Sequence, residues 1–199
     1  REMGQQFGQS PAASADVLPY CSALKYTGVL FSPTFDRDHT VFSDFGDVKK
    51  SVDWGLTWTP LYSGGSYASN RLAISPHYVD DQTLYWTSGS SESHFLIKST
   101  DGGKTWLSLT EEANIPDGIN VSYALYPPPT RDSTLFLAVR EYPFAYAQSG
   151  VWKSVDGGVT WRHVLGGARP STIAFSPYYE KDGIILVGGE TYHASLGLM

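Results

Sequence analysis

The sequence has 199 residues but only one cysteine and little charge of either sign. Cys21 cannot form an internal disulfide, so cysteine usage leaves the cellular compartment open. Charged residues make up 17% of the chain, and 20 acidic against 14 basic residues give a net charge of −6. No run of lysine or arginine is present. This composition argues against nucleic acid as a partner, because binding to phosphates depends on clustered basic side chains.

Long hydrophobic runs are also absent. No apolar stretch approaches the ~18 residues that a transmembrane helix needs. The first residues contain no hydrophobic signal core, so we expect that an export signal has been removed or that the sequence starts inside a longer protein. Residues 1–22 are rich in Gln, Ala, Ser and Pro and predict an extended arm or linker. Residues 23–199, in a chain that is 41% hydrophobic, predict a globular domain.

The common signatures of catalysis are missing. The five histidines show no spacing typical of metal ligands, and the sequence has no nucleophile elbow, phosphate-binding loop or dinucleotide fingerprint. We therefore predict no cofactor.

An eight-residue pattern, S-x-D-x-G-x-T-W, occurs three times. Its copies contain Ser51, Asp53, Gly55 and Trp58; Ser99, Asp101, Gly103 and Trp106; and Ser154, Asp156, Gly158 and Trp161. Ser and Asp side chains accept hydrogen bonds from backbone N–H groups in tight turns, and glycine adopts a positive φ without steric cost. Each copy therefore predicts a hairpin turn with a structural role, followed by a tryptophan in the core.

These octads resemble the Asp-box, or bacterial neuraminidase repeat. The resemblance implies a β-propeller of the kind found in sialidases, sortilin-type receptors, xyloglucanases and photosystem II assembly factors. It implies no single activity, because these proteins share a fold and not a function.

A second motif precedes each Asp-box. It is a proline-containing loop that closes on Asp38, Asp81, Asp132 and Asp182, at intervals of 43, 51 and 50 residues. This period is typical of a four-stranded propeller blade. Turn capping accounts for the repeated aspartates, and bound calcium is a less favoured alternative.

The repeat predicts an all-β propeller of four-stranded antiparallel blades at about 27–62, 71–109 and 122–165, with a partial fourth blade at 173–199. In the second unit we expect strands at 71–75, 83–88, 95–99 and 105–109. A propeller needs roughly four to eight blades. Closure is therefore expected to need further sequence or another chain.

The Asp-boxes and the proline loops fall on one face of this propeller, and the loops that do not repeat fall on the opposite face. Variable loops on a rigid scaffold usually carry specificity. The candidate binding residues on that loop face are Tyr67, Arg71, Glu92, His94, Arg140, Glu141, Tyr142, Phe144, Tyr146, Glu190, Tyr192 and His193.

The sequence favours a non-catalytic module outside the cytoplasm that binds a protein or glycan partner or acts as a scaffold, including as a subunit of a larger assembly. The alternative is a fragment of a glycoside hydrolase, xyloglucanase-like rather than sialidase-like. Sialidases carry an Arg-Ile-Pro motif, whereas the only Ile-Pro here, Ile115-Pro116, follows Asn114. A carboxylate pair roughly 5–10 Å apart among Glu92, Glu141 and Glu190 would favour the enzyme.

Overall fold

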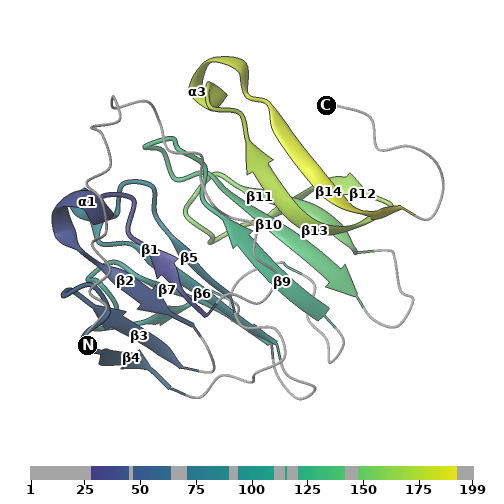
Figure 1. Cartoon of the computed structure of the whole chain (residues 1–199). Coiled ribbons are helices and arrows are strands. Elements are labelled where there is room, and N and C mark those ends of the chain that lie inside the picture. Colours follow the sequence, from purple (N-terminus) through teal and green to yellow (C-terminus); the bar gives the residue numbers. More distant parts are fainter. Residues whose placement is uncertain are drawn as a thin grey trace, which may run out of the picture.

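The computed structural model describes residues 28–44, 47–63, 71–89, 94–109, 115, 121–141 and 148–191. The arm predicted for residues 1–22 lies outside these ranges. The described residues form four antiparallel sheets and three short helices (Figure 1). Three of the sheets have four strands, each paired with its neighbour in sequence order. This arrangement is that of propeller blades, as predicted.

We number the sheets as blades 1 to 4 along the chain. Blade 1 contains β1 (Leu30–Phe31), β2 (Val41–Ser43), β3 (Val48–Ser51) and β4 (Thr59–Tyr62). Blade 2 contains β5 (Arg71–Ile74), β6 (Leu84–Gly89), β7 (His94–Ser99) and β8 (Leu107–Ser108). Blade 3 contains β9 (Val121–Tyr126), β10 (Leu135–Glu141), β11 (Gly150–Ser154) and β12 (Arg162–Gly166). Blade 4 contains β13 (Ala168–Phe175) and β14 (Ile185–Thr191).

The last strand of blade 2 is shorter than the sequence predicts. A strand was expected at 105–109, but β8 spans only Leu107–Ser108. The reason is that Thr105 belongs to the turn: its hydroxyl and its backbone N–H both donate to Asp101. Conversely, β13 begins at Ala168, ahead of the start at 173 that the repeat predicts.

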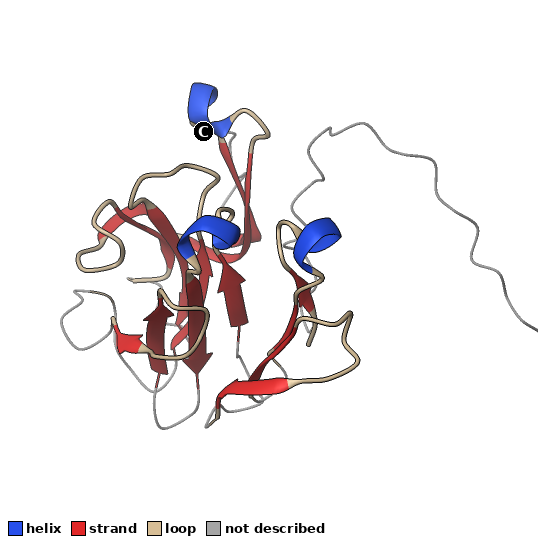
Figure 2. Cartoon of the chain, turned by 90° about the vertical axis from the view of Figure 1, so that its left-hand side faces the viewer, coloured by secondary structure: helices blue, strands red, loops and turns tan. Residues whose placement is uncertain are grey.

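Three proline loops contain a helical turn that the sequence analysis did not predict. These turns are α1 (Phe35–Asp38), α2 (Tyr78–Asp81) and α3 (Tyr179–Asp182). Each is followed by a left-handed residue, His39, Gln82 or Gly183. Figure 2 shows the three helices on the same side of the molecule. The equivalent loop of blade 3 has no helix, because its consecutive prolines disfavour helical backbone at the residues before them.

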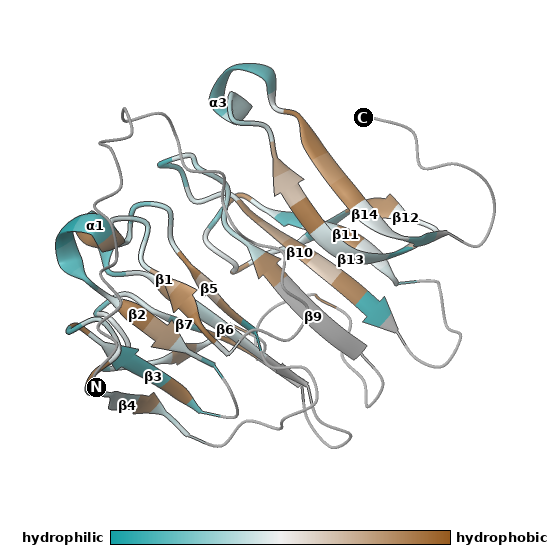
Figure 3. Ribbon diagram, viewed as in Figure 1, coloured by the Kyte–Doolittle hydropathy of each residue, from teal (hydrophilic) through white to brown (hydrophobic). Residues whose placement is uncertain are grey.

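The hydrophobic core lies between adjacent blades. One cluster, with Phe42 and Trp86, joins blades 1 and 2. A second, with Leu96 and Leu137, joins blades 2 and 3, and a third, around Ile173, joins blades 3 and 4. Figure 3 shows apolar residues along many of the strands, while α1 and α3 are mostly hydrophilic.

Candidate functional site

The three Asp-box turns share the same hydrogen bonds. In blade 2, Ser99 Oγ donates to Asp101 Oδ1 at 2.8 Å and accepts the N–H of Gly103 at 2.8 Å. Asp101 Oδ2 accepts the hydroxyl of Thr105 at 2.6 Å. The copies in blades 1 and 3 repeat these contacts. All of the bonds lie within the turn, so the turn holds itself together.

These bonds lower the pKa of the Asp-box carboxyls. The hydroxyl of Thr57 is the main cause for Asp53, and that of Thr160 for Asp156; each pKa falls to about 2. The pKa of Asp101 is lowered by the equivalent hydroxyl of Thr105. Each group therefore stays ionised at neutral pH and acts as a hydrogen-bond acceptor.

The prediction that all three Asp-box tryptophans lie in the core is wrong for Trp58. Trp161 is 3% exposed, whereas Trp58 is 38% exposed. Trp106 is intermediate, and its indole N–H donates to the carbonyl of Leu61 in blade 1. Burial of the indole depends on contact with the preceding blade. The described residues include no blade before blade 1.

The opposite edge of the sheets carries the predicted loop face. Arg71 starts β5, Arg140 lies near the end of β10, and Glu190 lies near the end of β14. His94 starts β7 and Glu141 ends β10. The remaining candidates lie outside the described residues: Tyr67, Glu92, Tyr142, Phe144, Tyr146, Tyr192 and His193.

Two of the predicted residues meet across the junction of blades 3 and 4. Glu190 Oε2 lies 4.0 Å from Arg140 Nη2 and 3.2 Å from Arg169 Nη1. The two guanidiniums are largely buried, with side-chain exposures of 24% and 12%, whereas the Glu190 side chain is 70% exposed. Arg169 was not among the predicted residues. Arg169, in β13, is the register partner of Glu190, in β14, and this pairing would have identified Arg169.

A second charged group on this edge joins blades 1 and 2. Asp44 follows β2, and its carboxylate accepts the backbone N–H of Leu72 at 3.0 Å. Burial raises the pKa of Asp44, while this hydrogen bond and the charge of Arg71 oppose the rise. Sequence reasoning missed Asp44 because it lies in a short turn that has no motif of its own.

Blade 3 also places an aromatic pair between its last two strands. Trp152 and His163 stack with ring centroids 4.7 Å apart and an interplanar angle of 14°. The indole N–H donates to the carbonyl of Gln148, just before β11. Trp152 packs against the core between blades 2 and 3, so this pair supports the blade.

The carboxylate pair that would favour an enzyme remains a prediction. Among its three candidates, only the side chain of Glu190 is described, and it is engaged by two arginines. Within the described ranges, no group of three His, Cys, Asp or Glu side chains could hold a metal ion. The loop aspartates bond to the protein instead: Asp81 Oδ2 accepts the hydroxyl of Ser75 at 2.6 Å, and Asp38 and Asp182 make the same contact.

Comparison with known proteins finds similarity to xyloglucanases. The chain is 28% identical over 178 residues to the xyloglucanase Xgh74A of Acetivibrio thermocellus, which covers 80% of this chain and 20% of that protein. It therefore spans about a fifth of the length of the curated relatives it matches. No family model matches the sequence, and membership of the sialidase-type superfamily remains a resemblance.

Similarity to a solved structure supports the fold. A GH74 enzyme of Niastella koreensis superposes with a TM-score of 0.55 at 21% identity, covering 81% of this chain and 26% of that one. A GH74 xyloglucanase of Xanthomonas campestris gives a TM-score of 0.42 at 17% identity, covering 77% of this chain and 27% of that one. The first similarity supports the propeller assignment.

Among the described residues, no helix is long and apolar enough to cross a membrane.

Proposed function

We propose that this chain is a segment of a xyloglucanase-like glycoside hydrolase, built of Asp-box blades, whose loop face binds a β-linked polysaccharide. The observation that carries the proposal is the similarity to a xyloglucanase over 80% of the chain. The charged groups on the loop face are consistent with it. Because polysaccharides of this kind lie outside cells, the proposed location is extracytoplasmic.

The cluster of Arg140, Arg169 and Glu190 is a described part of the proposed binding face. The arginines hold the exposed Glu190 carboxylate from the side facing the protein. The carboxylate can then accept hydrogen bonds from sugar hydroxyls, because oxygen lone pairs remain toward solvent. The aromatic residues Tyr142, Phe144 and Tyr146, which follow Glu141 in the sequence, would stack on sugar rings.

The test is affinity electrophoresis in gels with and without xyloglucan. Glu190→Gln removes the exposed charge, and we expect it to reduce retardation. Glu180→Gln is the matched control, because Glu180 is exposed on the same blade but lies in α3, at the opposite edge. Replacement of Tyr142, Phe144 and Tyr146 by serine should spare the fold and weaken retardation further. Equal retardation of all the variants would contradict the proposal.

A non-catalytic scaffold role is the second candidate. It is favoured by exposed apolar side chains on blade 1, among them Phe31 at 60%, Trp54 at 59% and Leu56 at 81%. Phe31 and Trp54 both pack against Phe35, and exposed apolar patches commonly contact another protein. The intact mass of the native assembly distinguishes the candidates, since a scaffold would copurify with a partner and the hydrolase segment would not require one.

A further inference from the structure

Three lysines occupy the same place in successive blades. Lys50, Lys98 and Lys153 each precede the serine of an Asp-box. Each ammonium lies over an aromatic ring of the neighbouring strand, 6.0 Å from Phe42, 5.5 Å from Tyr85 and 5.5 Å from Phe136, respectively. The lysines are therefore equivalent, and their surroundings can be compared directly.

At two of the three junctions, a tyrosine of the next blade covers this aromatic ring. Tyr78, in α2, packs edge-on against Phe42 at 5.3 Å, and Tyr179, in α3, packs edge-on against Phe136 at 6.3 Å. The hydroxyl of Tyr78 also accepts a hydrogen bond from Lys50 Nζ at 3.1 Å. The tyrosine thus fills each of these two junctions. At the junction of blades 1 and 2, the hydroxyl of Tyr78 also gives Lys50 a hydrogen-bond acceptor.

The junction of blades 2 and 3 lacks this tyrosine. Pro129 stands at its position in the repeat, and the loop has no helical turn. A cavity of about 230 Å³, half open to solvent, is present at this junction, lined by Tyr85, Lys98, Asp81, Asp132, Thr134 and Gly157 among others. Within the part of the chain that the structure describes, Lys98 has the ring contact with Tyr85 but no hydrogen-bond acceptor. Burial lowers the pKa of Lys98.

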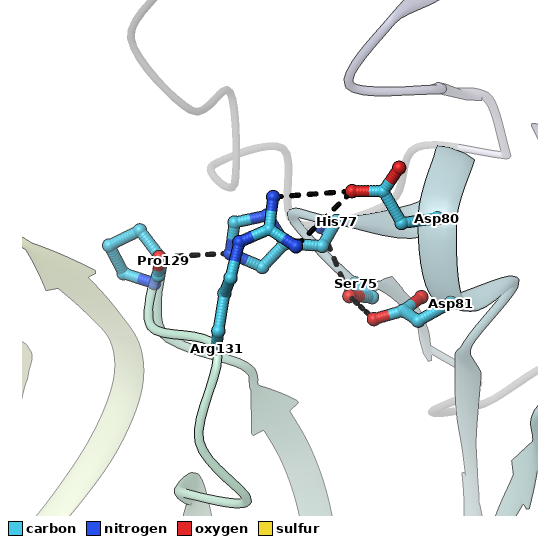
Figure 4. Close-up of polar contacts among 6 residues, drawn as sticks. All are labelled: Ser75, His77, Asp80, Asp81, Pro129 and Arg131. Atoms are coloured by element: carbon cyan, nitrogen blue, oxygen red, sulfur yellow. Dashed lines mark hydrogen bonds and ion pairs between the residues drawn. The ribbon is translucent and has the colours of Figure 1, made fainter.

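Contacts between the two blades line one side of this cavity. Both terminal nitrogens of Arg131 donate to Asp80 Oδ2 at 3.2 Å, and His77 Nε2 donates to the carbonyl of Pro129 at 3.1 Å. Figure 4 shows these contacts bridging the two loops above Ser75 and Asp81. The cavity is therefore bounded by interactions that are already formed.

The lining combines donors and acceptors. Lys98 and Arg131 donate, and the carboxylates of Asp80, Asp81 and Asp132 accept. Three carboxylates against two cations disfavour an anion, whereas a hydroxyl group can both accept from the lysine and donate to a carboxylate. The volume is below the about 300–1,000 Å³ of pockets for drug-sized ligands, which suits a single small ring.

We propose that the cavity between blades 2 and 3 is a binding site for a neutral polyol of about the size of one pyranose unit, with a ligand hydroxyl on Lys98 in place of the missing tyrosine hydroxyl. The site lies on the same edge as the Asp-boxes and helical turns. It is thus separate from the loop face and does not depend on the function proposed above.

The test is titration of the ¹⁵N-labelled chain with methyl β-D-glucopyranoside, followed by amide chemical shifts. We expect saturable shifts at Ser133 and Gly157, which line the cavity. Lys98→Met keeps the length of the side chain but removes the donor, and should weaken binding roughly ten- to a hundredfold, as expected for loss of a hydrogen bond to a charged group. Lys50→Met is the matched control, because its junction is filled by Tyr78, and should leave the affinity unchanged.

Two further variants make the result specific. Ser133→Phe, at an exposed position on the lining, should fill the cavity and abolish the shifts. Glu190→Gln, on the opposite edge, should leave them intact. The proposal is overturned if no saturable shifts appear, if Lys98→Met binds as tightly as the parent chain, or if acetate or phosphate shifts these amides in preference to the glycoside.

Discussion

One glycine position in the Asp-box allows backbone strain to be separated from packing between blades. Gly55, Gly103 and Gly158 are equivalent and have φ values of +88°, +92° and +100°. Replacement by alanine should cost about 1–2 kcal/mol at each position, because the left-handed region brings Cβ close to the following carbonyl.

The surroundings of the three glycines differ. A Cβ at Gly103 would lie 2.5 Å from Cδ1 and 3.2 Å from Cβ of Leu61, on the preceding blade. A Cβ at Gly55 would meet only the Trp58 ring, at 3.6 Å, an ordinary contact distance. Overpacking of this kind costs about 1–3 kcal/mol. Gly103→Ala should therefore destabilise by about 2–5 kcal/mol in total and Gly55→Ala by about 1–2.

Gly158→Ala should fall between these two. Its Cβ would lie 2.8 Å from Leu109 Cδ1, the far end of a flexible side chain. The assay is urea denaturation, in which the midpoint should shift while the slope stays constant. In the double variant, Leu61→Ala should recover part of the loss caused by Gly103→Ala, because neighbouring substitutions couple. Equal losses for Gly55→Ala and Gly103→Ala would refute the packing argument.

Three further predictions concern the same turns. Ser99→Ala should cost about 1–3 kcal/mol in urea denaturation, since it leaves the buried N–H of Gly103 unbonded; a neutral result would mean that water replaces the hydroxyl. The pKa of Asp156 is lowered from 3.8 to about 2, so its stabilising effect is present above pH 4 and lost as the pH falls toward 2. Thr160→Val should weaken this acid dependence of the melting temperature, and an unaltered profile would contradict the assignment. Trp54→Gly should change stability by less than about 1 kcal/mol, because relief of φ +66° offsets the lost aromatic stack; a loss above about 2 kcal/mol would show that the stack dominates.

The repeat made the fold predictable, because each octad encodes a turn whose hydrogen bonds are local. The same holds for Asp81, which the sequence places in a closing loop and which bonds to Ser75 and Thr83 there. The loop face was less predictable. Asp44 bonds across the junction of blades 1 and 2, and Arg169 contacts Glu190 on the paired strand of its own blade, so both partners come from residues distant in the sequence. No short pattern encodes such contacts.

The Asp-box tryptophans show where local prediction ends. The indole N–H of each donates to the carbonyl of the box glycine, at 3.0, 3.1 and 2.9 Å for Trp58, Trp106 and Trp161. The octad alone therefore sets the orientation of the indole. Burial does not follow the octad, because Trp58 is 38% exposed and Trp161 only 3%. Since Trp106 bonds to Leu61 of the blade before it, a blade packed in the same way against blade 1 should bury Trp58, and quenching of its fluorescence by iodide should then fall.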